Sequence, residues 1–161
     1  MGRKSVKENK NVYQLKREEL GLSREQAALQ LNGLSEDQIE RIENGSRAPH
    51  PDEVLALAEG YAAPSLRNYY CTNQCPIGMR HGVVIEASDL PAITLQTLAS
   101  LNEMEKYKDR FIEISADSVI DDSELEDFRT IRQTLKKIAL SVASLRMWVE
   151  EVEAKNAAAQ K

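Results

Sequence analysis

The two cysteines and a neighbouring histidine are the side chains whose types and spacing raise the question of metal or redox chemistry. Cys71 and Cys75 are four positions apart, and His81 follows in the same proline- and glycine-containing segment. A structural zinc site needs four ligands, whereas this segment offers three. We therefore expect reduced thiols and no bound metal, with Cys71, Cys75 and His81 as weak ligand candidates. A redox or metal sensor built on the two cysteines is the alternative.

Carboxylates gather in a second segment, residues 116–124, where they raise the question of calcium binding. The segment reads ADSVIDDSE. It lacks the central glycine and the downstream glutamate of an EF-hand loop, so helix capping explains these acids better than calcium does. The chain also has no glycine-rich phosphate loop and no nucleophile motif, and its two histidines, His50 and His81, belong to no catalytic constellation. We expect no enzymatic activity and no cofactor.

The composition of the 161 residues favours helices. Aromatic residues make up 5% and charged residues 29%, and glycine and proline are few, which predicts an all-α protein. The net charge of −5 gives no general attraction to nucleic acid, so any such contact must come from local clusters of basic residues. The basic N-terminus has no apolar core of a signal peptide, and no apolar run reaches membrane-spanning length. We expect a cytoplasmic protein that does not contact a membrane.

Two short helices separated by a tight turn are predicted between Ser23 and Gly45. Each begins with a serine followed three residues later by a glutamine, which is the spacing of a capping box. The pairs are Ser23 with Gln26 and Ser35 with Gln38. Asn32-Gly33 and Asn44-Gly45 supply residues that tolerate a left-handed backbone, so each helix ends at such a pair.

The run GLSREQAALQLNGLSEDQIERIENGSRAPHP resembles the helix-turn-helix of phage repressors, Cro proteins and related bacterial regulators, the XRE family. The most specific part is, in order, Ser35, Ile39, Ile42, Glu43, Asn44, Gly45 and Pro49. The resemblance covers about residues 11–70 and implies a five-helix, repressor-like domain. In that fold residues 36–43 form the recognition helix, which lies in the major groove of double-stranded DNA.

The resemblance also implies which residues touch DNA. The positions that match the base-contacting sites of the family hold Glu36, Asp37 and Arg41. Arginine can donate two hydrogen bonds to guanine, and a carboxylate can accept one from cytosine N4. The candidates for phosphate contacts are Arg24, the backbone of Gly45, Ser46 and Arg47, with Arg3 and Lys4 from a basic, disordered arm over residues 1–10.

The remaining elements of this domain follow from caps and periodicity. A helix over residues 12–20 is predicted after Asn11, with Val12, Leu15 and Leu20 facing the core. Further helices are expected over residues 51–61 and 64–70, and residues 71–87 form a linker that carries the two cysteines.

A helical hairpin is predicted over residues 88–155. One helix runs from Ser88 or Asp89 to about Ile114, and a longer one opens at Ser123. The longer helix alternates steps of three and four between apolar residues, namely Phe128, Ile131, Leu135, Ile138, Val142, Leu145, Val149 and Val152. A two-helix hairpin cannot bury both faces, so the first seven of these residues are the candidate interface of a homodimer. Residues 114–148 are faintly similar to the C-terminal helices of some phage regulatory proteins, and residues 156–161 are expected to fray.

Two functions therefore compete. The first is a dimeric, sequence-specific transcriptional regulator that binds DNA. The second is a protein-interaction module, in which Glu36, Asp37, Glu40 and Glu43 form an acidic face for a basic protein partner and the hairpin docks a second protein. DNA binding through phosphates must weaken steeply as salt rises, which separates the two.

Overall fold

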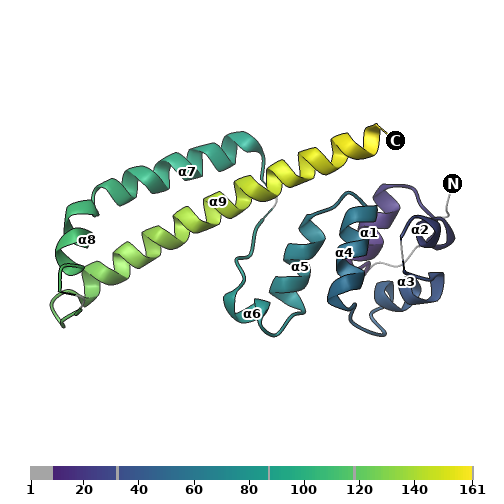
Figure 1. Ribbon diagram of the computed structural model, residues 1–161, viewed down its shortest axis with the longest axis horizontal. Coiled ribbons are helices and arrows are strands. Elements are labelled where there is room, and N and C mark those ends of the chain that lie inside the picture. Colours follow the sequence, from purple (N-terminus) through teal and green to yellow (C-terminus); the bar gives the residue numbers. More distant parts are fainter. Residues whose placement is uncertain (1–8, 32, 87, 118, 161) are drawn as a thin grey trace. The chain divides into compact units, whose positions relative to one another are not determined.

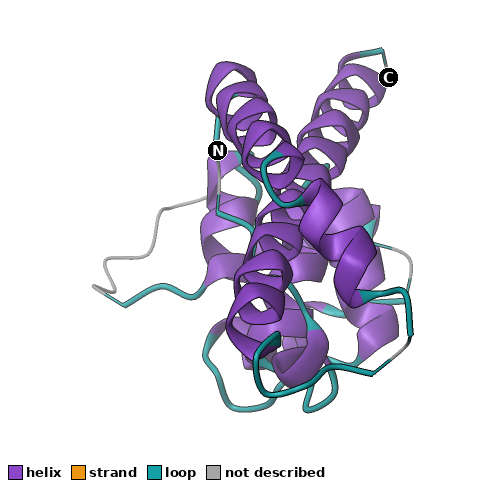
Figure 2. Ribbon diagram, turned by 90° about the vertical axis from the view of Figure 1, so that its left-hand side faces the viewer, coloured by secondary structure: helices purple, strands orange, loops and turns teal. Residues whose placement is uncertain are grey.

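The computed structural model describes residues 9–31, 33–86, 88–117 and 119–160. Within these ranges all regular structure is helical (Figures 1 and 2), which confirms the predicted all-α class. The helices are α1 (Val12–Glu19), α2 (Arg24–Gln30), α3 (Glu36–Glu43), α4 (Pro51–Gly60), α5 (Ser65–Asn73), α6 (Gly78–His81), α7 (Leu90–Glu105), α8 (Lys108–Ile114) and α9 (Leu125–Ala159). They form two compact units, one made of Met1–Val84 with Val149–Lys161 and the other of Ile85–Trp148.

The first three helices begin at the predicted caps. The Asn11 side chain accepts a hydrogen bond from the Gln14 backbone N–H at 3.0 Å. Both capping boxes are complete: each serine hydroxyl accepts from a backbone N–H, and each glutamine side chain accepts from the N–H of its serine. These bonds satisfy N–H groups that a helix start leaves without partners, so α2 and α3 begin at fixed residues.

The turn after α3 is a Schellman-type ending. Gly45 has a φ of +72°, a left-handed conformation that favours glycine. Its N–H donates to the Ile42 carbonyl at 3.2 Å, and the Ser46 N–H donates to the Arg41 carbonyl at 2.9 Å. Gly33, between α2 and α3, is also left-handed, with a φ of +89°. Glycine at these two positions lets the chain leave each helix at a steep angle.

The core of the first unit lies among α1 to α5. Its buried residues are Tyr13, Ala27, Leu31, Leu34, Ile39, Ile42, Leu57, Ala58, Tyr61, Ala63 and Leu66. The predicted inward face of α1 was wrong in part, because Leu15 and Leu20 are exposed while Tyr13, Gln14 and Arg17 are buried. Partners on other helices explain the difference: the Tyr13 hydroxyl donates to the Gln74 side chain at 2.8 Å, and Arg17 pairs with a buried carboxylate of α3.

The segment expected to be a linker starts inside a helix. α5 extends to Asn73 and so contains Cys71, and the short α6 follows at Gly78. The Asn68 side chain donates to the Val83 carbonyl at 2.8 Å, which ties the end of this segment back to α5. Residues 71–84 are therefore part of the first unit.

The second unit is an antiparallel hairpin. α7 begins at Leu90, directly after its cap Asp89, whose carboxylate accepts from the Ala92 N–H at 2.9 Å. The helix expected to continue to Ile114 instead breaks at Lys106 and Tyr107, and α8 starts at Lys108. Lys137 pairs with Glu103 at 2.8 Å, and Arg110 pairs with Asp127 at 2.7 Å. Residue 103 of α7 thus contacts residue 137 of α9, and the later residue 110 of α8 contacts the earlier residue 127 of α9. α9 therefore runs antiparallel to α7 and α8.

The interior of the hairpin differs from the predicted apolar seam. The buried residues of α9 within this unit are Ile131, Thr134, Ser141 and Ser144, and Ser100 is buried on α7. The hydroxyls of Thr134, Ser141 and Ser100 donate to carbonyls four residues earlier in their own helices, at 2.7–3.1 Å. Small side chains with satisfied hydroxyls let two helices approach closely at little cost. The larger apolar residues Leu135 and Val142 are left exposed.

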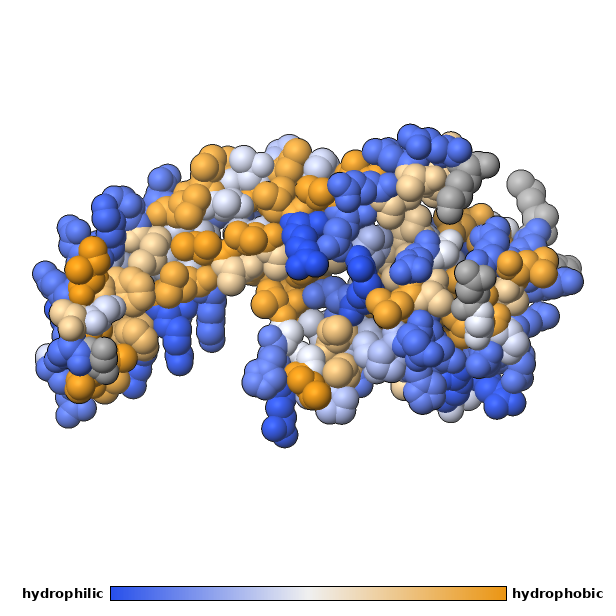
Figure 3. All heavy atoms as spheres, viewed as in Figure 1, coloured by the Kyte–Doolittle hydropathy of each residue, from blue (hydrophilic) through white to orange (hydrophobic). Residues whose placement is uncertain are grey.

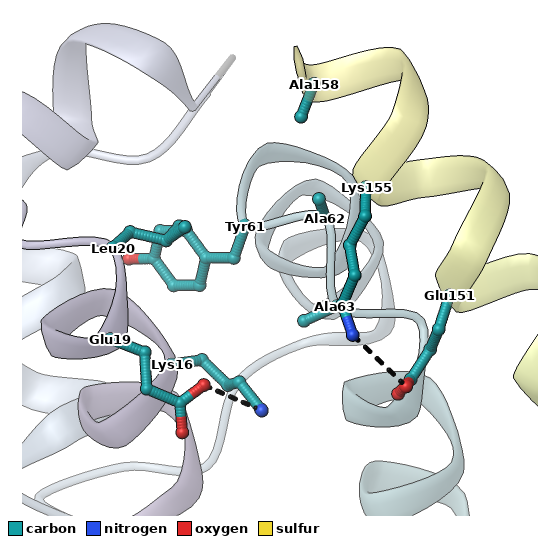
Figure 4. A pocket seen from close by; sticks show the side chains of 9 residues that line it. All are labelled: Lys16, Glu19, Leu20, Tyr61, Ala62, Ala63, Glu151, Lys155 and Ala158. Atoms are coloured by element: carbon teal, nitrogen blue, oxygen red, sulfur yellow. Dashed lines mark hydrogen bonds and ion pairs between the residues drawn. The ribbon is translucent and has the colours of Figure 1, made fainter. Parts of the chain in front are cut away.

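The C-terminal part of α9 belongs to the first unit. It runs through Ala159, so the stretch expected to fray from residue 156 is helical up to that residue. Arg67 of α5 pairs with Glu150 at 2.6 Å. A hollow of about 280 Å³ lies between this part of α9 and the end of α1 and the turn after α4 (Figure 4). It is lined by Lys16, Glu19, Leu20, Tyr61, Ala62, Ala63, Glu151, Lys155 and Ala158. Its two lysines pair with Glu19 and Glu151 respectively.

Candidate nucleic-acid interface

Helix α3 buries one side and presents the other to solvent. Ile39 and Ile42 are buried, whereas Glu36, Asp37 and Arg41, the three base-contact candidates, are exposed. The side chains of Asp37 and Arg41 are 65% and 59% exposed, and they form an ion pair at 3.0 Å across one helical turn. All three candidates therefore lie on one accessible surface, and the one arginine is already paired with an acid of that surface.

The side chain of Arg24, at the start of α2, contacts two glutamates of α3. Its Nη1 donates to Glu40 at 2.8 Å and its Nε donates to Glu43 at 2.9 Å. The side chain is about a quarter exposed, so it stays within reach of solvent. The predicted phosphate contact is thus a residue that also bridges α2 to α3.

Glu43 is not part of the acidic face that the sequence suggested. Its side chain is 1% exposed and accepts hydrogen bonds from Arg17 at 2.6 and 2.8 Å. The hydrogen bonds that Arg17 donates to Glu43 raise the pKa of Arg17 above its usual value, against the opposing effect of burial. A carboxylate with two arginine partners in the core holds α3 against α1, and it leaves Glu36, Asp37 and Glu40 as the exposed acids of the helix.

Arg47, beyond the turn, is held by Glu53 of α4. Its Nη1 and Nη2 donate to the two carboxylate oxygens at 2.7 and 2.6 Å. The His50 N–H donates to the same carboxylate at 2.8 Å, in place of a helix-capping side chain. The hydrogen bond from Arg47, followed by that from the His50 backbone, lowers the pKa of Glu53. Arg47 is therefore positioned at the start of α4 next to Ser46, another phosphate candidate, which is exposed.

The backbone of the turn is already engaged. The N–H groups of Gly45 and Ser46 both donate to carbonyls of α3. A phosphate at this turn would therefore meet the Ser46 hydroxyl and the Arg47 guanidinium more readily than the Gly45 N–H. Arg3 and Lys4, the candidates on the basic arm, lie outside the described residues.

Comparison with known families agrees with this geometry. Residues 15–68 match the family model described as a helix-turn-helix domain. The chain carries a helix-turn-helix domain. No curated protein and no solved structure matches the chain. The matched range contains α2, α3 and the paired arginines Arg17, Arg24 and Arg47, so the acidic surface of α3 belongs to the helix of this domain that follows the turn.

The two thiols lie at the end of α5 and just after it. Cys71 is exposed and Cys75 is half-buried, and both are free thiols. The Gly78 N–H approaches the Cys75 sulfur at 3.5 Å. In the described ranges no three histidine, cysteine, aspartate or glutamate side chains are placed to hold a metal ion together, His81 included.

None of the described helices is long and apolar enough to cross a membrane.

The candidate dimer interface of α9 is only partly available. Ile131 is fully buried within its own chain, so its predicted place in the interface was wrong. Leu135, Val142, Leu145 and Val149 are exposed, and Phe128 and Ile138 are half-buried. Sequence reasoning missed Thr134 and Ser141 as interior residues, because hydroxyl residues in a helix look like surface positions in a hydropathy pattern.

Proposed function

We propose that this chain is a sequence-specific, DNA-binding transcriptional regulator of the repressor and Cro type, the XRE family, which acts as a dimer in the cytoplasm. The observation that carries the proposal is the exposed side of α3 in a domain that matches a helix-turn-helix family model. Glu36, Asp37 and Arg41 are exposed on that side. They match the base-contacting positions of the family that the chain resembles, so we assign them to base edges in the major groove.

The acids on this surface make the proposed mode of reading unusual. Arg41 would donate to O6 and N7 of a guanine, and Glu36 or Asp37 would accept from N4 of a cytosine. Each acid raises the electrostatic cost of approaching DNA, so the proposal predicts modest affinity and strong dependence on the correct sequence.

Phosphate anchoring would come from the arginines that the domain holds in place. Arg24 and Arg47 each pair with glutamates of the domain. A guanidinium has five N–H donors, so an arginine in such a pair can still donate to a phosphate oxygen. The pairs restrict the side chains before DNA arrives, which lowers the entropy that binding must remove. Ser46 and the basic arm would add to this sequence-independent anchoring.

The alternative is a protein-interaction module with little DNA binding. It is favoured by the same surface, because Glu36, Asp37 and Glu40 are exposed while the nearby arginines are paired with acids. In this reading a basic protein, rather than DNA, covers α3. No enzymatic activity and no cofactor belongs to either proposal.

Selection of sites from a pool of random duplexes, followed by binding titrations at several salt concentrations, tests the regulator. We expect enrichment of one sequence family and a linear fall of log K with log salt, with a slope of about −0.9 per phosphate neutralised. If no sequence family is enriched and the affinity for DNA does not change with salt, the regulator is wrong and the protein-interaction module becomes the proposed function.

The dimer is tested separately by sedimentation. Val142 is 57% exposed on α9, so an aspartate there disturbs no packing within the chain. Val142→Asp should convert a dimer into a monomer of unchanged helicity, because a charge would have to be buried in the interface. Leu29→Asp, on an exposed leucine of α2 that the proposed interface does not include, is the matched control and should remain dimeric.

A further inference from the structure

The hollow beside the C-terminal part of α9 has both apolar and charged walls. Over this part of α9 the space-filling view shows hydrophilic side chains next to mildly apolar ones (Figure 3). The lining residues all belong to the first unit. The apolar members are Leu20, Tyr61, Ala62, Ala63 and Ala158, and the charged members are Lys16, Glu19, Glu151 and Lys155. An apolar surface with a few polar groups is typical of a small-molecule site.

The apolar floor of the hollow is fixed by the core of the domain. Tyr61 and Ala63 are 3% and 5% exposed, so their side chains are held in place. Ala62 lies between them with a φ of +48°, a left-handed conformation in which glycine is the usual residue. The alanine at this turn therefore adds a methyl group to the lining. Leu20, directly after α1, remains 49% exposed, so part of the apolar lining is open to a ligand.

Two lysines reach the hollow from different helices. Lys16 extends from α1 and Lys155 extends from α9, and their ammonium groups point toward one another across the gap (Figure 4). Lys16 pairs with Glu19 at 2.8 Å, and Lys155 pairs with Glu151 at 4.0 Å, each along its own helix. Each glutamate lies on the outer side of its lysine (Figure 4). An anion placed between the two ammonium groups would therefore be attracted by both.

The present partners leave both lysines able to bind a ligand. The side chains of Lys16 and Lys155 are 33% and 71% exposed, and ion pairs at such positions contribute little to stability. An ammonium group has three N–H donors, so it can donate to its glutamate and to a ligand together. A carboxylate has two acceptor oxygens, so one carboxylate can accept from both lysines.

We propose that this hollow binds a small organic anion, namely a monocarboxylate with a compact apolar body. The carboxylate accepts hydrogen bonds from Lys16 and Lys155, and the apolar body lies on Leu20, the Tyr61 ring and Ala158. At roughly 30 Å³ for each water-sized group, the hollow holds about nine non-hydrogen atoms. The bound anion connects α1 with the C-terminal part of α9. This site goes beyond the proposed function and does not require DNA binding.

Benzoate is the probe for this site, because it combines one carboxylate with a flat apolar ring of the required size. It is titrated into the isotope-labelled protein and followed by NMR. We expect saturable shifts of the backbone amide signals of Leu20, Ala62, Ala63 and Ala158, with a dissociation constant on the order of 1 mM. If these signals do not move at about 20 mM benzoate, far above that constant, the site is wrong.

Two further probes separate the charge from the apolar body. Benzamide has nearly the same shape as benzoate and no charge, so it should bind at least about tenfold more weakly. Acetate has the charge without the ring and should also bind at least about tenfold more weakly, because it leaves the apolar lining uncovered. Equal affinity for benzoate and benzamide would overturn the role of the lysines. Equal affinity for benzoate and acetate would overturn the role of the apolar lining.

Replacement of each lysine tests the bridge directly. Lys16→Gln and Lys155→Gln should each raise the dissociation constant of benzoate by about three- to tenfold, because each removes one charged donor. Lys137→Gln, at an exposed, ion-paired lysine of the second unit, is the matched control and should leave the constant unchanged. Wild-type affinity of both hollow variants would contradict a carboxylate held between the two lysines.

Ala158→Leu tests the apolar part of the hollow without changing the core of the domain. Ala158 is exposed on α9, and leucine is a good helix former, so the variant should keep its helicity by circular dichroism. The larger side chain occupies the hollow and should abolish benzoate binding. Ala159→Leu, at the neighbouring position that does not line the hollow, is the matched control and should bind benzoate normally. Unchanged binding by Ala158→Leu would place the ligand elsewhere and overturn the proposal.

Discussion

Arg17 and Glu43 form a two-pronged ion pair in the core of the helix-turn-helix domain. Nε of Arg17 donates to Oε1 at 2.6 Å and Nη2 donates to Oε2 at 2.8 Å, while Nη1 donates to the Leu22 carbonyl at 2.6 Å. The planar guanidinium fits the carboxylate in one orientation only. The pair therefore fixes the end of α3 against α1, and with it the surface that carries Glu36, Asp37 and Arg41.

Removing the charge of Glu43 should strongly destabilise the domain. Glu43→Gln keeps the shape of the side chain but leaves the Arg17 guanidinium, which cannot lose its proton, without a buried anion. We expect a loss of about 3–5 kcal/mol in the free energy of unfolding, measured by urea denaturation. Glu40→Gln removes an exposed partner of Arg24 and should change stability by less than about 1 kcal/mol. Similar losses for the two variants would show that the pair does not hold α3 in place.

Arg24→Ala should weaken binding to every DNA sequence by a similar factor. A phosphate contact carries no base information, so the slope of log K against log salt should fall by about one unit. Arg67→Ala is the matched control, since Arg67 is an exposed, ion-paired arginine on α5. An unchanged slope for Arg24→Ala would mean that this side chain serves only to bridge Glu40 and Glu43.

Arg41→Ala tests whether α3 reads bases. A guanidinium bound to guanine contributes roughly 1–3 kcal/mol of discrimination, whereas the pair with Asp37 contributes about 0.2–0.5 kcal/mol to helix stability. We expect a loss confined to the selected sequence and relaxed preference at one base pair, measured by competition titrations. Equal affinities of Arg41→Ala and the wild type for all duplexes would exclude base reading by this residue.

Neutralising the acids of α3 provides the complementary measurement. If Glu36 and Asp37 are merely tolerated near DNA, Glu36→Gln and Asp37→Asn should tighten binding to all sequences, because two repulsive charges are removed. If they accept from cytosine, affinity for the selected sequence should fall relative to others. The ratio of the affinity for the selected sequence to the affinity for other sequences, measured for each variant and for the wild type, decides between these two roles.

Lowering the pH should weaken the ion pair between Arg47 and Glu53 of α4. The pKa of Glu53 is lowered in the folded protein by Arg47 and by the His50 backbone. A lowered pKa means that the stabilisation is fully present above the ordinary glutamate value, about 4.3, and is lost as the pH falls through the folded-state value. Glu53→Gln should therefore reduce the dependence of unfolding free energy on pH below that value. Glu59→Gln, at an exposed position of the same helix, should retain it.

The starts of α1, α2, α3 and α7 were determined by the sequence alone. Asn11, Ser23, Ser35 and Asp89 cap the helices that follow them, as the residue types and spacing predicted. A capping bond joins groups three residues apart, so the chain needs no distant partner to form it. The all-α class and the turns at Gly33 and Gly45 are local for the same reason, because they depend on backbone preferences of a few consecutive residues.

Which side of each helix is buried was decided by the tertiary structure. On α1, Tyr13 and Arg17 point inward and Leu15 points outward; on α9, Thr134 and Ser141 are interior while Val142 is exposed. Hydropathy ranks residues by their average preference for burial, but the buried side is the one that faces a neighbouring helix. Where that neighbour supplies a carboxylate or requires a close approach, a polar or small side chain is favoured over a leucine.

The pairing of charges is also a product of tertiary structure. The sequence places Glu43 on the same helix as Glu36, Asp37 and Glu40, and nothing in its spacing separates it from them. Its two arginine partners lie 26 and 19 residues away, on α1 and α2. Ion pairs between helices depend on the angle at which the helices cross, which arises only when the core of Ile39, Leu57 and Leu66 closes.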